Sequence, residues 1–139
     1  MNTPANVTDL AGRILISALF LDAGLAKVAG YAGTQAYMAS AGVPGGLLPL
    51  VIALEVLGAV AIIVGFRTRI VAAGLAAFTL AAAVMFHSGS DTMQQLLFMK
   101  NLAVAGGFLL LASRGAGNWS LDARRERLTG THDPIAERA

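Results

Sequence analysis

Four long apolar stretches alternate with three short polar connections along the chain. The third stretch contains the run IVAAGLAAFTLAAAVMF, which has no charged residue and no polar stripe at helical spacing. A soluble bundle of buried helices is disfavoured, because nothing would cover such faces in water. A membrane-spanning helix needs roughly 17–25 mostly apolar residues. The pattern therefore predicts an all-α integral membrane protein, a bundle of four transmembrane helices over residues 10–29, 47–66, 70–87 and 96–113.

Composition agrees with the membrane prediction and excludes several function classes. Of the 139 residues, 56% are hydrophobic and 13% are charged, about half the charged fraction of a typical soluble domain. The mean hydropathy is +0.68. There is no cysteine, which excludes disulfides, iron–sulfur clusters and thiolate metal sites. A formal net charge of +2 is too small to suggest a nucleic-acid partner. The start, MNTPANVTDLAGR, lacks the basic region of a secretory signal peptide.

The distribution of arginine predicts the orientation of the bundle. Arg67 and Arg69 occupy the second connection, whereas the first and third carry no lysine or arginine. Five more arginines follow the fourth apolar stretch. Since basic residues concentrate on the cytoplasmic side, we expect both termini there, and the first and third connections outside. Residues 1–9 form an N-terminal tail. The polar tail of residues 114–139 is predicted as a cytoplasmic interfacial segment around Trp119 followed by disorder.

Within this orientation, six polar side chains fall in the outer half of the membrane. Charged groups are not tolerated against lipid without a partner, so we expect one connected polar cluster. Glu55 is too short to reach water from mid-span, and we expect Lys27, Lys100 or both to compensate it. His87 is then the group that titrates near neutrality. The cluster comprises Asp22, Lys27, Glu55, His87, Lys100 and Asn101.

Several of these residues, and also Arg13, have a purely structural interpretation. Lys27 can extend to the outer surface, and Arg13 is expected to extend to the inner one. These two residues are fourteen positions apart, about four helical turns, so they share a face. Asp22 lies five residues before Lys27, a poor pairing interval within one helix, so we expect it to meet another helix. His87 can simply cap the third helix, and Glu55 is either a functional group or the centre of a structural ion pair.

Four motifs occur in order along the chain: a Phe-x-x-x-Gly-x-x-Lys run after an early Arg, a Y-x-x-x-x-G-V-P connection, an E-x-x-G…G-x-x-T-R segment and a G-x-x-S-L-D tail. Together they resemble the DoxX family over nearly the whole chain. Asp22 is not part of this pattern. The matching residues are Arg13, Phe20, Gly24, Lys27, Tyr37, Gly42, Val43, Pro44, Glu55, Gly58, Gly65, Thr68, Arg69, Lys100, Asn101, Ser120 and Asp122.

The resemblance implies a four-helix protein of the bacterial inner membrane. The family takes its name from a subunit linked to a terminal quinol oxidase and a thiosulfate:quinone oxidoreductase. Other members are linked to membrane oxidoreductase complexes and to oxidative-stress defence. By this resemblance the chain is expected to be a multi-pass membrane subunit of a quinone-linked or oxidative-stress complex.

The residues themselves leave three functions open. With no cysteine, and His87 alone in the membrane region, there is no bis-histidine haem pair and no standard metal site. No intrinsic cofactor is therefore expected, but a quinone brings its own redox centre. Lys100, His87 and Asn101 could donate to its carbonyls, and Glu55 could act as a base. The alternatives are a non-catalytic subunit that anchors other redox subunits, and a homo-oligomer that passes small solutes or protons.

Overall fold

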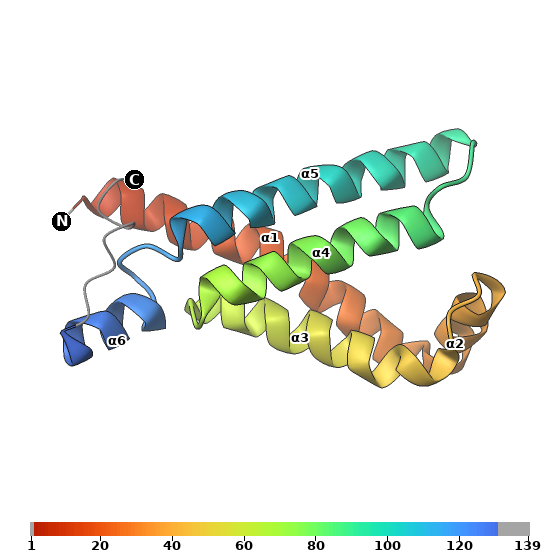
Figure 1. Ribbon diagram of the computed structural model, residues 1–139, viewed down its shortest axis with the longest axis horizontal. Helices are drawn as coiled ribbons and strands as arrows, with labels where there is room; N and C mark the ends of the chain where they lie inside the picture. Colours follow the sequence, from red (N-terminus) through yellow and green to blue (C-terminus); the bar gives the residue numbers. More distant parts are fainter. Residues whose placement is uncertain (1, 131–139) are drawn as a thin grey trace.

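The computed structural model describes residues 2–130, in which helices are joined by turns and loops and no strand occurs (Figure 1). Three segments are long and apolar enough to cross a membrane, and there are up to four if the bent pair α1–α2 counts as one span. The axes of α1 and α2 differ by 102°. The helices are α1 (Thr3–Ala29), α2 (Tyr31–Ser40), the short 3-10 turn η1 (Gly45–Leu47), α3 (Leu48–Val64), α4 (Thr68–Phe86), α5 (Thr92–Arg114) and α6 (Leu121–Thr129).

Three helical segments differ from those expected. Helix α1 begins seven residues earlier than predicted, with a proline in its first turn, where the missing N–H costs nothing. Helix α2 occupies the first connection, which hydropathy left without structure. Helix α6 lies in the predicted polar tail, and its first turn is capped by Ser120, whose Oγ accepts from the Ala123 N–H at 3.1 Å. The remainder of that tail, 131–139, lies outside the described residues.

The long helices form two pairs. Helix α1 packs along α3, α4 packs along α5, and α3 contacts α4 to join the pairs. Figure 1 shows the start of α1, the α3–α4 turn, the end of α5 and α6 at one end of the bundle, here called the tail end. At the opposite end, the α2 end, the pair α4–α5 diverges from α1–α3. A stacked contact between Tyr37 and Phe86, with ring centroids 5.5 Å apart, links α2 to the end of α4.

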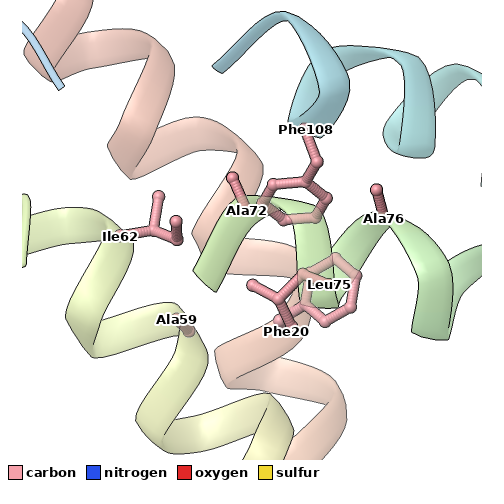
Figure 2. Close-up of a cluster of buried hydrophobic side chains, with 7 residues drawn as sticks. All are labelled: Phe20, Ala59, Ile62, Ala72, Leu75, Ala76 and Phe108. Carbon is pink, nitrogen blue, oxygen red and sulfur yellow. The ribbon is translucent and has the colours of Figure 1, made fainter. Parts of the chain in front are cut away.

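The core where the pairs meet combines small residues with a few large ones (Figure 2). Phe20 of α1 meets Phe108 of α5 edge to face, with ring centroids 5.2 Å apart. Gly58 lets α3 approach α4, because a Cβ there would lie 3.1 Å from a methyl group of Leu75. Large apolar side chains such as Leu15 and Ile70 instead face outward. Small residues inside and large apolar residues outside are expected of helices that pack in lipid.

Candidate functional site

The one salt bridge within residues 2–130 joins Lys27 of α1 to Glu55 of α3. Lys27 Nζ lies 3.0 Å from both carboxylate oxygens and donates a hydrogen bond to Oε1. The Glu55 side chain is only 6% exposed, whereas that of Lys27 is 27% exposed. The prediction that a lysine reaches Glu55 is confirmed, and the lysine is Lys27, not Lys100.

A glycine one turn earlier brings the two helices close enough for this pair. A Cβ on Gly24 would lie 2.6 Å from Cγ2 of Val56 and 3.3 Å from Cβ of Glu55. Gly24 belongs to the buried face of α1, which also contains Arg13. Lys27 continues that face, so the prediction that Arg13 and Lys27 point the same way is confirmed. Lys27 also donates to the Ala23 carbonyl at 3.4 Å, and it is therefore held against α3 and does not merely extend to the membrane surface.

The other predicted cluster residues make no hydrogen bond or ion pair with this pair within residues 2–130. His87 is the C-cap of α4, and its Nδ1 is 3.0 Å from Gln94 Oε1 across the α4–α5 turn. Asn101 is buried, with 8% of its surface exposed. Lys100 and Asp22 are exposed, and neither they nor Asn101 has a side-chain partner within the described chain. No hydrogen bond or ion pair there joins any of these four residues to Lys27 or Glu55.

The prediction of one connected cluster is therefore wrong for residues 2–130. Its physical cause is the divergence of the two helix pairs at the α2 end, which hydropathy does not report (Figure 1). Rotation about the helix axis adds to this effect. Successive residues point about 100° apart around a helix, so Asn101 faces the bundle while Lys100 faces outward.

Arg13 was expected to extend to the inner membrane surface, but at the tail end it is buried in the bundle. The residue is 1% exposed. Its Nη1 donates to the carbonyls of Ile63 at 2.7 Å and Ile62 at 3.3 Å, and its Nη2 donates to the carbonyl of Trp119. The last carbonyls of a helix have no partner within it, and they favour a positive charge. Arg13 thus caps the end of α3 and ties it to the segment that leads into α6.

Arg69, predicted only to set topology, caps the end of α5 in the same way. Its guanidinium donates to the carbonyls of Ala112 and Arg114 at 3.3 Å, and also to that of Ser113. Arg67 has no such side-chain contact within the described residues. Its backbone instead makes the α3–α4 turn, with a left-handed φ of 44°.

Asp122 belongs to the G-x-x-S-L-D motif, and the sequence alone does not indicate its role. Its carboxylate accepts the N–H groups of Arg67 at 2.7 Å and Thr68 at 2.8 Å, and so caps the start of α4. Its own N–H donates to the Gly65 carbonyl at 2.9 Å. Gly65 has φ 72°, and a Cβ there would lie 2.3 Å from Ser120 Cβ. We refer to Arg13, Gly65, Arg69 and Asp122 as the tail-end cluster.

The motifs found in the sequence therefore divide between two places in the structure. Gly24, Lys27 and Glu55 make the α1–α3 ion pair, whereas the tail-end cluster fixes the helix ends. Within residues 2–130, no group of three or more His, Cys, Asp or Glu side chains could hold a metal ion. The ion pair neutralises the charge of Glu55, and the tail-end cluster orients the helix ends.

Comparison with known proteins places these motifs in a family. The family model described as DoxX matches residues 8–88. The inner membrane protein YqjF of Escherichia coli K12 is 54% identical over 118 residues, which is 84% of this chain and 91% of that protein. The inner membrane protein YphA of the same organism is 40% identical over 123 residues, covering 83% of this chain and 88% of that protein. No solved structure matches. The chain belongs to the DoxX family.

Proposed function

We propose that this protein is a non-catalytic membrane subunit of a quinone-linked redox complex, which it anchors in the inner membrane. Both relatives are named inner membrane proteins, and the apolar helices have the length and composition to span that membrane. The link to quinone chemistry rests on the family resemblance. The subunit would bind the lipid bilayer and the redox subunits that it anchors.

The observation that carries the non-catalytic part is the Lys27–Glu55 ion pair. Both carboxylate oxygens lie 3.0 Å from one ammonium group, so the charge is neutralised within the chain. A buried ion pair of this kind can fix how two helices align. The donors that would be needed to hold a quinone beside Glu55 are dispersed: His87 is paired with Gln94, and Lys100 points outward.

The redox role is testable in inner-membrane vesicles from cells that lack the protein. We expect quinone-dependent oxygen uptake to fall in these vesicles and to recover when the wild-type chain is restored. Lys100→Met and Asn101→Leu should restore it equally, because a scaffold needs neither side chain. Unchanged uptake in the absence of the protein would contradict the redox link. Lost uptake with either variant at normal protein level would instead place a quinone-reactive site on α5.

The proposed orientation puts the tail end in the cytoplasm. The motivation is the concentration of arginines at the tail end, which contains Arg67, Arg69, Arg114 and the arginines of α6. A phosphatase reporter, active only outside the cytoplasm, should be active when fused at Gly45 and inactive when fused at the C-terminus. An active C-terminal fusion would reverse the orientation.

A further inference from the structure

Two adjoining hollows open at the tail end. The larger is an open recess of about 960 Å³ between the α3–α4 turn, the end of α5 and α6. The smaller, of about 250 Å³, is a groove between α1 and α5. The two hollows are neighbours, because the same four residues, Thr8, Asp9, Arg114 and Gly115, line both.

The recess is rich in guanidinium groups. Arg67, Arg114 and Arg125 line it from three different segments, and none has a carboxylate within salt-bridge distance in residues 2–130. Arg69 also lines the recess, with its guanidinium on the carbonyls at the end of α5.

Three acids also line the recess and reduce the excess of positive charge. Asp122 is occupied by two backbone N–H groups, and the other two are Asp9 and Glu126. The adjoining groove adds Arg13 and no further acid, so Arg13, Arg67, Arg114 and Arg125 against these three carboxylates leave a net positive charge around the two hollows. In addition, Thr68 lines the recess with a fully buried hydroxyl that has no hydrogen-bond partner. The recess therefore combines cationic donors with an unsatisfied hydroxyl, a set suited to an anionic oxygen.

The groove has the opposite chemistry. Beyond the four shared residues and Arg13, it is lined by Gly12, Ile16, Gly107, Leu110 and Leu111. A Cβ on Gly12 would meet nothing within 4 Å, so that position leaves open space. An apolar chain could lie there at the depth of the membrane while an attached anionic group reached the recess.

We propose that the two hollows form one binding site for an anionic phospholipid. The phosphate head group lies in the recess among Arg67, Arg114 and Arg125, and an acyl chain lies in the α1–α5 groove. Basic pockets beside membrane helices attract anionic head groups by the same electrostatics. A free phosphate would use the recess alone, so the groove identifies the lipid.

The test measures lipid retention by the detergent-purified full chain, using native mass spectrometry. Phosphatidylglycerol and phosphatidylcholine with identical acyl chains are the probes. We expect phosphatidylglycerol to be retained and phosphatidylcholine to be lost. Arg114→Gln and Arg67→Gln should each weaken phosphatidylglycerol binding about fivefold. Arg124→Gln is the matched control, because this exposed arginine of α6 does not line the recess, and it should change nothing.

Filling the groove tests the acyl chain separately. Gly12→Leu should weaken phosphatidylglycerol binding without lowering the melting temperature, since its side chain enters open space. Gly106→Leu, also in open space but outside the groove, should bind as the wild type does. Equal retention of the two lipids, or an equal loss with Arg124→Gln, would overturn the proposal. Displacement of the lipid by millimolar inorganic phosphate, with no effect of Gly12→Leu, would overturn it in favour of a free-anion site.

Discussion

Replacement of Lys27 by methionine should lower the melting temperature of the purified protein by roughly 10 °C. The Glu55 side chain is 6% exposed, and Lys27 is its partner in the ion pair. Removing one member of a buried pair leaves an uncompensated charge, which costs about 3–5 kcal/mol. Because Lys27 is 27% exposed, we expect the lower end of that range, which gives the stated shift at about 3–4 °C per kcal/mol.

Two variants separate loss of the pair from loss of a lysine. Lys100→Met removes an exposed lysine that has no partner in the described chain, and it should melt within about 2 °C of the wild type. The double variant Lys27→Met/Glu55→Leu should recover most of the lost stability, because apolar residues can replace a buried ion pair at little cost. Equal melting temperatures for Lys27→Met and Lys100→Met would show that the pair contributes nothing.

Replacement of Arg13 by methionine should open the tail end of the bundle. The change removes three hydrogen bonds from a cationic donor and leaves the carbonyls of Ile62, Ile63 and Trp119 without that partner. Hydrogen bonds to charged groups contribute about 1.5–3 kcal/mol each. We expect α6 to detach, so that trypsin cleaves at its arginines at least about tenfold faster, because each 1.4 kcal/mol of lost docking raises the open population tenfold.

A conservative change should give an intermediate result. Lysine at position 13 keeps the charge but lacks the planar guanidinium that reaches several carbonyls at once. The Arg13→Lys variant should therefore be cleaved at a rate between those of the wild type and Arg13→Met. Arg67→Met is the control, since the Arg67 side chain has no contact of this kind within the described residues. Cleavage of Arg13→Met at the wild-type rate would show that the three hydrogen bonds do not hold α6.

The spans and the ion pair could be predicted because each follows from the cost of placing groups in lipid. Apolar stretches of sufficient length must become helices there, and α3, α4 and α5 are found close to their expected positions. Glu55 likewise required a cation, and Lys27 lies on the expected face of α1. Hydropathy could not predict α2 or the 102° bend between α1 and α2, because it reports the length of an apolar segment and not the direction of its axis.

The prediction was wrong for the rest of the cluster because depth in the membrane does not determine whether two side chains meet. Its members were assigned a depth from the sequence, but not a direction around the helix or a distance between helices. The divergence of the α2 end and the outward rotation of Lys100 are properties of packing. The tail-end cluster was missed because Arg13 and Arg69 contact backbone carbonyls, which leave no signature in the residue types of their partners.

The long reach of Arg13 sets an order for biosynthesis. Its acceptors at Ile62 and Ile63 follow it by about fifty residues in the chain, and the acceptor at Trp119 by more than one hundred. Helix α1 is therefore synthesised while its guanidinium still lacks the partners that it has in the finished fold. The contacts of Arg13 can be complete only after the segment that contains Trp119 has left the ribosome.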